Sequence, residues 1–263
     1  MTTAPALDTQ ARVILALALR EVHTLYGGKS LGYLWAVIQT AFGLAVFWAV
    51  RYFAHAAAPH GMTVLTYLVA GFGVWNIINQ TLGKCMAAID GNRALLTFPQ
   101  VTPLDIMLAR CLVVTATQVI SMAILLGGGT LFGYHFAISS VGMLIICVLL
   151  AALLGLGLGT LLGSLAVYLP ALQQVVPMIM RILFFASGIF YSVSAFSHRV
   201  GDFLMLNPIM QLIELVRMSL ANGYISQYAD FWYVVQVTLG SLFFGLLLER
   251  YVRRRVMVYR LIP

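Results

Sequence analysis

Residues 138–167 read ISSVGMLIICVLLAALLGLGLGTLLGSLAV, and this stretch contains no charged residue. A bilayer core is about 30 Å thick, so about 20 apolar residues in a helix are enough to cross it. Because the run does not alternate between polar and apolar residues, it predicts a membrane-spanning helix rather than a strand of a barrel. The protein is therefore expected to be built from helices in a membrane.

The composition of the whole chain extends this interpretation. Its 263 residues are 62% hydrophobic and 9% charged, whereas soluble domains are about 45–50% apolar and about 25% charged. We therefore expect an all-α polytopic membrane protein with one transmembrane domain, residues 1–263. The six predicted transmembrane helices are residues 31–54, 63–83, 106–132, 138–167, 172–193 and 230–249.

An amphipathic helix is expected before the first span. Residues 7–25 place apolar side chains at helical spacing, while Asp8, Arg12 and Arg20 share the opposite side. A helix of this kind lies in the interface between lipid and water. We therefore predict an N-terminal interfacial helix over residues 7–25.

The stretch 194–229 is apolar but is interrupted by several charges and by Asn207-Pro208. If it forms two re-entrant half-helices broken at Asn207-Pro208, six spans remain and both termini lie on one side. That side then holds 11 of the 15 basic residues, as expected for the cytoplasmic side. They are Arg12, Arg20, Lys29, Lys84, Arg93, Arg110, Arg250, Arg253, Arg254, Arg255 and Arg260. We expect Glu214 and Arg217, three residues apart, to form a local ion pair in this re-entrant region.

The sequence offers no candidate for catalysis or for a metal site. It contains no HExxH, no GxSxG and no pair of carboxylates on one intramembrane face. The cysteines Cys85, Cys111 and Cys147 lie in apolar runs without CxxC spacing, so we interpret them as small core residues. The basic residues are scattered among short loops rather than gathered on one face, so no nucleic-acid partner is expected.

Three glycines in the fourth predicted span recur every four residues. Gly155, Gly159 and Gly163 lie on one helical face with this spacing. Small residues in this pattern let two membrane helices approach closely. We predict a helix-packing face here rather than a nucleotide-binding loop.

Arg181 lies about nine residues inside the fifth predicted span, too deep to reach an interface easily. Ionisable residues at such depth usually face a water-filled path or a protein partner. We interpret Arg181 as lining a polar path; the alternative is a structural bond to a helix carbonyl or to a carboxylate.

The cytoplasmic segment 84–105 joins the second and third spans. Asp90, Asn92 and Arg93 are expected to start a short helix that ends near Phe98-Pro99. Its apolar side chains Leu95, Leu96 and Phe98 would then be exposed, which suits docking to a soluble partner. The alternative is a helix that lies among lipid headgroups.

Several short segments together resemble the type 2 ABC exporter permeases for cell-surface polysaccharides, and the KpsM capsule-export permeases in particular. The resemblance runs from about residue 12 to 250. The segments are Leu19-Arg20-Glu21 with Tyr26, Leu31-Gly32-Tyr33-Leu34-Trp35, Asn92 through Pro103-Leu104-Asp105 with Ala109-Arg110, Pro170-Ala171-Leu172-Gln173-Gln174 with Pro177, Leu206-Asn207-Pro208 with Glu214-Leu215-Val216-Arg217, and Gly223-Tyr224-Ile225.

The resemblance implies a homodimeric permease in the bacterial inner membrane with both termini cytoplasmic. A separate cytoplasmic ABC ATPase dimer would bind ATP and Mg, so this chain would bind no cofactor and would have no catalytic site. The transported molecule would be a lipid-linked acidic capsular polysaccharide. A periplasmic co-polymerase and an outer-membrane export protein are candidate further partners. The alternatives are an O-antigen or teichoic-acid exporter permease, and a non-transporting scaffold for glycan synthesis.

The resemblance also assigns roles to residues of this sequence. The segment 84–105 becomes the ATPase-coupling segment, with Asp90, Asn92, Arg93, Leu95, Leu96 and Phe98. The candidates for a substrate entrance are Arg20, His23, Lys29, Lys84 and Arg110. Channel lining is expected from Arg181, Phe184, Phe185 and Tyr191, because aromatic faces give a sliding sugar chain apolar contact without a deep trap. The periplasmic re-entrant region 194–229 contains Asn207, Pro208, Glu214 and Arg217.

Overall fold

The computed structural model describes residues 3–26, 32–53, 62–92, 94–98, 100–133, 137–193, 198–226 and 229–259. Within these ranges the secondary structure is entirely helical, so the predicted all-α class is confirmed. The α-helices are α1 (Thr3–Tyr26), α2 (Gly32–Phe53), α3 (Val64–Met86), α4 (Pro103–Leu131), α5 (Val141–Ala166), α6 (Leu172–Ala186), α7 (His198–Leu204), α8 (Pro208–Leu220) and α9 (Phe231–Tyr259), and two one-turn 3-10 helices are η2 (Asp90–Asn92) and η3 (Leu95–Thr97).

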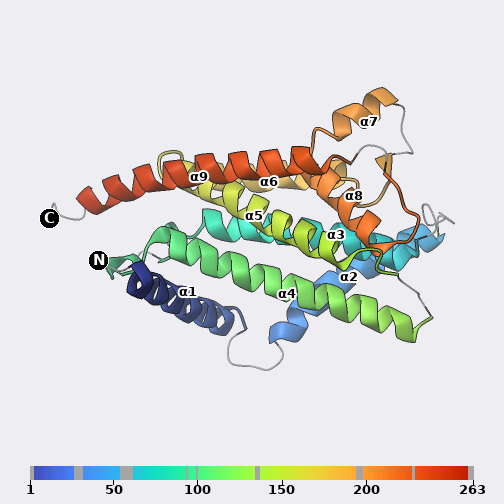
Figure 1. The fold of residues 1–263 in the computed structure, drawn as a ribbon, viewed down its shortest axis with the longest axis horizontal. Helices are drawn as coiled ribbons and strands as arrows, with labels where there is room; N and C mark the ends of the chain where they lie inside the picture. Colours follow the sequence, from blue (N-terminus) through green and yellow to red (C-terminus); the bar gives the residue numbers. More distant parts are fainter. Residues whose placement is uncertain are drawn as a thin grey trace.

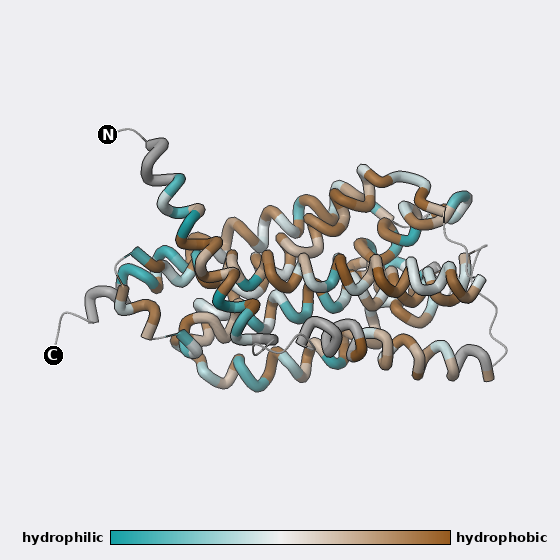
Figure 2. The backbone as a smooth tube through the Cα atoms, turned by 90° about the horizontal axis from the view of Figure 1, so that it is seen from below, coloured by the Kyte–Doolittle hydropathy of each residue, from teal (hydrophilic) through white to brown (hydrophobic). Residues whose placement is uncertain are grey.

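The long helices form an elongated bundle (Figure 1), in which α3, α4, α5, α6 and α9 run along the long axis. The start of α1 and the end of α9 lie at one end, which we call the terminal end, together with the turn between α3 and α4. Helices α7 and α8 lie at the opposite end, which we call the α8 end. Hydrophobic residues dominate the middle of the bundle (Figure 2).

Three helices in the described ranges are long and apolar enough to cross a membrane. They are α4, α5 and the part of α9 from Phe231 to Arg254. Two shorter apolar helical stretches are Thr40–Ala49 in α2 and Leu172–Ala186, which is α6. The count of six spans and the re-entrant arrangement stay predictions.

Helix α6 is shorter than the predicted span 172–193, which is a correction. It ends at Ala186 after 15 residues, a length of about 22 Å at a rise of about 1.5 Å per residue. Gly188 has a φ of 66°, a left-handed conformation that ends helices and that glycine adopts without steric cost. The helical part of this predicted span therefore ends at Ala186, at the α8 end of the bundle.

The glycines of α5 form the packing face that their spacing predicts. A Cβ atom on Gly159 would lie 2.6 Å from Cys85 Cβ of α3, and one on Gly157 would lie 2.5 Å from Ser241 Oγ of α9. Helix α5 therefore approaches α3 on one side and α9 on the other at distances that only glycine allows. The three cysteines are buried, as expected for core residues.

The segment 84–105 does not form the single short helix expected from the sequence. Two one-turn 3-10 helices, η2 and η3, replace it. The stretch between Gly91 and Pro99 is too short to repay the cost of starting an α-helix, because it can form only one or two hydrogen-bonded turns. Short 3-10 turns are common in such connectors. The prediction that Leu96 is exposed is wrong, because only 6% of this residue is exposed. Phe98 is 59% exposed, as predicted.

The break at Asn207-Pro208 is confirmed. Helix α7 ends at Leu204 and α8 begins at Pro208. The Asn207 side chain caps α8 by accepting a hydrogen bond from the Ile209 N–H at 3.0 Å. Proline fits the first helical position because no helical hydrogen bond is lost there.

Helix α1 lies alongside the first half of α4 (Figure 1). Leu17 and Glu21 are its buried residues, while Leu15 and Leu19 are exposed. The helix therefore has one face against the bundle and another that is apolar and uncovered. Its position on a membrane surface stays a prediction.

Candidate transport site

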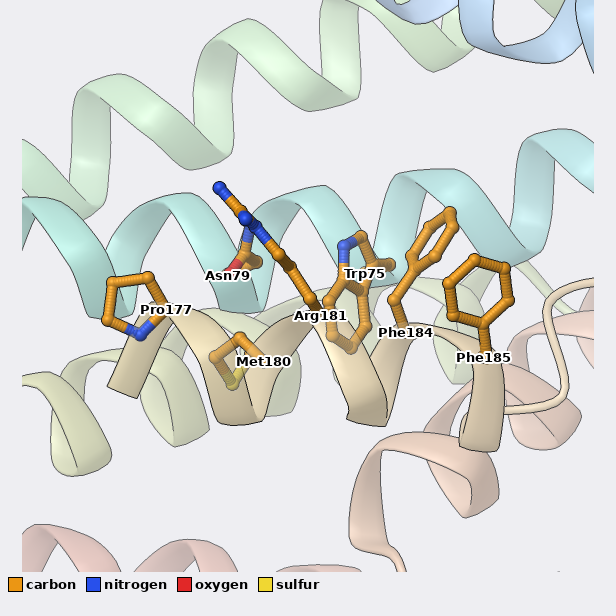
Figure 3. Close-up of a pocket in the computed structure, with 7 residues that line it drawn as sticks. All are labelled: Trp75, Asn79, Pro177, Met180, Arg181, Phe184 and Phe185. Atoms are coloured by element: carbon orange, nitrogen blue, oxygen red, sulfur yellow. The ribbon is translucent and has the colours of Figure 1, made fainter. Parts of the chain in front are cut away.

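A cavity of about 340 Å³ lies between α3 and α6. Figure 3 shows its lining, which combines one cation, one amide and several aromatic rings. The lining residues are Trp75, Asn79, Pro177, Met180, Arg181, Phe184 and Phe185. Three of the four predicted channel residues, Arg181, Phe184 and Phe185, are thus brought together.

Arg181 supplies the charge of this cavity. Its side chain rises from α6 across α3, and the guanidinium lies beside Asn79 (Figure 3). The residue is exposed, and within the described part of the chain it has no hydrogen-bond or ion-pair partner. A planar guanidinium carries five N–H donors in a geometry that matches carboxylate or phosphate. The site can therefore bind an anionic group.

The wall beside Arg181 is aromatic. The Phe184 ring centroid lies 5.3 Å from those of Trp75, Phe185 and Phe190. Phe47 of α2 extends this cluster, with its ring centroid 6.4 Å from that of Phe184. The cluster joins α2, α3 and α6 and presents ring edges and faces that can contact the apolar faces of sugars.

The sequence interpretation missed Trp75 and Asn79. They lie four residues apart on α3 and therefore share one helical face. The sequence did contain a signal for them, because the polar Asn79 follows Trp75 by one helical turn inside the predicted apolar span 63–83. Tyr191 is not among the residues that line this cavity, and its hydroxyl donates to the Phe185 carbonyl at 2.9 Å. Its role in a channel stays a prediction.

Two of the candidate entrance residues, Arg20 and Arg110, make structural bonds near the terminal end. Arg20 donates to the Asn92 side-chain oxygen at 2.9 Å. The Arg110 guanidinium donates to the Lys84 carbonyl at 2.6 Å and lies 3.5 Å from the Glu21 carboxylate. These bonds tie the segment 84–105 to α1 and α4.

The remaining entrance candidates differ in their surroundings. Lys84 is half-buried just beyond the predicted span 63–83, and burial lowers the pKa of its ammonium group, whereas the nearby Glu21 raises it. His23 is exposed, and Lys29 lies outside the described residues. The entrance role of all five residues stays a prediction.

The predicted coupling residues divide into buried anchors and exposed positions. Asn92 is buried and donates to the Ala88 carbonyl at 3.0 Å. Asp90 is exposed and accepts a hydrogen bond from Gln173 of α6 at 2.7 Å. Leu95 is half-buried and Arg93 lies outside the described residues. Phe98 is thus a large apolar side chain that is exposed in the described part of this segment. Its contact with a partner stays a prediction.

A buried polar network at the α8 end was not foreseen beyond its Glu214–Arg217 pair. That pair is confirmed, with 2.9 Å between Arg217 Nη1 and Glu214 Oε1 and side chains that are 0% and 1% exposed. Arg217 Nη2 also donates to the Gly188 and Ile189 carbonyls at 2.9 Å and 3.1 Å. Its Cζ atom lies 3.5 Å from the centroid of the Tyr67 ring, close enough for a cation–π interaction.

This network joins α8 to three other parts of the chain. The Tyr224 hydroxyl donates to the second Glu214 oxygen at 2.6 Å. The bonds to Gly188 and Ile189 hold the turn that follows α6, and Tyr67 belongs to α3. A buried arginine needs such partners, because an uncompensated charge inside a protein is costly. Arg217 therefore stabilises the packing of α8 against α3 and the turn after α6, whereas Arg181 lines the cavity.

Comparison with known proteins identifies the family. The family model for the ABC-2 type transporter matches residues 12–221. The chain belongs to the ABC-2 type transporter family. This agrees with the resemblance found in the sequence, and the matched range covers most of α1, the residues that line the cavity and all of α8.

Known relatives match between 76% and 92% of the chain. The polysialic acid transport protein KpsM of Escherichia coli is 28% identical over 244 residues, which are 92% of this chain and 94% of that protein. The capsule polysaccharide export inner-membrane protein CtrC of Neisseria meningitidis serogroup B is 24% identical over 245 residues, 92% of this chain and 91% of that protein. The O-antigen export system permease protein RfbA of Myxococcus xanthus is 25% identical over 207 residues, 76% of this chain and 77% of that protein.

Proposed function

We propose that this chain is the membrane-spanning permease subunit of an ATP-driven exporter that moves a lipid-linked acidic capsular polysaccharide across the bacterial inner membrane. One observation carries the proposal. The chain is similar over 92% of its length to proteins named for polysialic acid transport and capsule polysaccharide export.

The chemistry of the cavity supports an acidic polymer. Arg181 offers unpaired donors to a carboxylate or a phosphate. Trp75 and Phe184 offer apolar surfaces against which sugar rings can slide, and Asn79 offers an amide to their hydroxyl groups. One cation among aromatic rings attracts an acidic chain without holding every sugar unit tightly.

The exposed face of α6 supports a path shared between two copies of the chain. Ile182 is 71% exposed and Phe185 is 62% exposed in the single chain. A second copy facing α6 would enclose the side on which Arg181 is exposed. In this proposal two copies form the path, and a separate cytoplasmic ATPase dimer that binds ATP and Mg docks at the segments 84–105.

The proposed orientation has both termini in the cytoplasm. The start of α1, the end of α9 and the proposed docking segment share the terminal end (Figure 1). Basic residues of this end would then face the cytoplasm, as the positive-inside rule requires. The α8 end, with its two short helices, would face the periplasm.

A second candidate function is the export of O-antigen. It is favoured by the 25% identity to the O-antigen export permease RfbA. Both functions require passage of a lipid-linked glycan, so the same cavity would serve either. They differ in the polymer that accumulates when the permease is lost.

The test is deletion of the gene in its own host, followed by analysis of cytoplasmic and surface glycans. The proposal predicts that lipid-linked acidic capsule polymer accumulates in the cytoplasm and disappears from the surface. Accumulation of O-antigen or teichoic acid would select the alternative exporter. Normal surface capsule in the deletion strain would contradict a role in capsule export, and loss of polymer synthesis without accumulation would favour a synthesis scaffold.

A further inference from the structure

Helix α6 carries Arg181 but is enclosed by little of the protein. Val176 and Met180 are the buried residues among its 15 positions. Its exposed side includes Val175, Met178 and Ile182. Within one copy, few buried side chains therefore hold α6 against its neighbouring helices.

A side-chain hydrogen bond links the first turn of α6 to the proposed docking segment. Gln173 Nε2 donates to Asp90 Oδ2 at 2.7 Å, across 83 positions of sequence. Asp90 begins η2, which is bounded on its other side by the buried Asn92. Movement of the docking segment would therefore reach α6 directly.

The other end of α6 is held more firmly. Arg217 donates to the carbonyls of Gly188 and Ile189, just beyond the last turn of α6. Asn207 Nδ2 donates to Ser187 Oγ at 3.0 Å. Arg217 is 0% exposed, so this end is fixed by a buried network.

Pro177 weakens α6 between these two ends. Proline has no N–H, so the Gln173 carbonyl lacks its usual helical donor four residues later. Helices commonly bend at such a position. The first turn, which bonds to Asp90, can therefore move relative to the part that carries Arg181.

We propose that the hydrogen bond between Gln173 and Asp90 transmits movement of the docking segment to α6, which makes Gln173 a positioning residue for transport. The inference rests on the proposed function and extends it. The α8 end of the helix acts as the pivot, the Gln173 end is driven, and Arg181 lies between them. One exposed hydrogen bond adds little net stability because water competes for both partners, so it can break and reform during each cycle.

The test uses the full-length permease purified with its ATPase and reconstituted in liposomes. Lipid-linked polysaccharide extracted from the deletion strain serves as substrate, and both ATP hydrolysis and polymer translocation are measured. For Gln173→Met we expect the ATPase to stay bound, hydrolysis to remain within about twofold of wild type, and polymer moved per ATP to fall about fivefold. Gln174→Met is the matched control, because Gln174 is exposed on the adjacent position and should behave as wild type.

Two further variants examine the bond itself. Gln173→Lys keeps a donor for the Asp90 carboxylate and should retain transport. Gln173→Glu places two carboxylates together and should lose it, and adding Asp90→Lys should restore it.

The possible results separate the inference from the function on which it rests. Normal transport by Gln173→Met, equal losses in Gln173→Met and Gln174→Met, or loss of the ATPase from Gln173→Met would each overturn the transmission role while wild-type transport stands. If the wild-type complex moves no polymer at all, the proposed function fails and this inference fails with it.

Discussion

Arg181 and Arg217 have different surroundings, and we therefore expect them to have different roles. Arg217 is fully buried and bonded to Glu214 and to two carbonyls. Arg181 has an exposed side chain beside an open cavity. The sequence placed Arg181 deep in an apolar run and suggested a path, but it could not show that Arg217 is the more buried of the two. That difference depends on the turn after α6, which folds back over α8.

Changing Arg181 tests its role in the path. Arg181→Leu should insert and retain the ATPase, because it removes a charge that has no partner in the described chain. Surface capsule should fall and cytoplasmic polymer should rise, whereas Arg181→Lys should keep partial export because the charge remains and the planar fork is lost. The measurement is surface polymer relative to cytoplasmic polymer at matched permease abundance. Met178→Leu, on the exposed side of the same helix, is the control, and wild-type export by Arg181→Leu would remove Arg181 from the path.

Changing Arg217 should instead affect stability. Arg217→Met leaves the Glu214 carboxylate buried without its cation, which costs about 3–5 kcal/mol. The thermal unfolding midpoint of the purified permease should fall by at least about 5 °C. The double variant Glu214→Gln with Arg217→Met should lose less, since no unpaired charge remains. An unchanged midpoint in Arg217→Met would mean that the network does not hold the α8 end.

At the scale of single elements, hydropathy located helices better than it located their ends. Helix α9 continues from Phe231 to Tyr259, past the predicted end at 249. Hydropathy follows contact with lipid, whereas a helix continues wherever its backbone hydrogen bonds remain satisfied. The pairing of Glu249 with Arg253, 3.8 Å apart at i,i+4, belongs to this extension. The end of α6 at Ala186 depends on the left-handed backbone conformation of Gly188 just beyond it, which composition does not reveal.

The docking segment provides a second case at this scale. The sequence predicted an apolar connecting segment over residues 84–105, but it could not tell which apolar side chains face the bundle. Packing against the core buries Leu96 and leaves Phe98 exposed. The two positions should therefore respond differently to the same substitution.

Phe98→Asp should leave the permease folded and release the ATPase during purification in detergent. Burying a polar group without a partner at a packed contact costs roughly 2–7 kcal/mol, and a charged group costs more. Leu96→Asp should lower the amount of folded permease, since it places the same charge in the core. The two readouts are co-purified ATPase and folded permease in detergent. Undiminished co-purification with Phe98→Asp would exclude this residue from the docking surface.

Two glycines of α9 give a matched test of close helix packing. A Cβ atom on Gly245 would lie 2.7 Å from the Gly157 carbonyl oxygen and would also meet Thr160, whereas one on Gly240 would meet nothing within 4 Å. Gly245→Ala should therefore destabilise the fold by about 1–3 kcal/mol. Gly240→Ala should be neutral or slightly stabilising, because alanine is the better helix former. Equal thermal midpoints for the two variants would contradict the close contact between α5 and α9.

At the scale of the whole molecule, the sequence predicted the all-helical class, and the family match agrees with the resemblance. It predicted Arg181, Phe184 and Phe185 together, because they share one helix. It missed Trp75 and Asn79, because they come from α3 and meet α6 only after the chain has folded. The hydrogen bond between Gln173 and Asp90 joins positions 83 residues apart, so the sequence could not predict it either.

We expect this permease to move an acidic glycolipid polymer through a path that contains Arg181. The most direct measurement uses inverted membrane vesicles that contain the permease, its ATPase and the lipid-linked polymer on their outer surface. An added polymer-degrading enzyme reports how much polymer has moved inside and become protected. The account predicts that ATP produces protection in wild-type vesicles and much less in Arg181→Leu vesicles. Protection that is the same without ATP, or the same in vesicles that lack the permease, would contradict it.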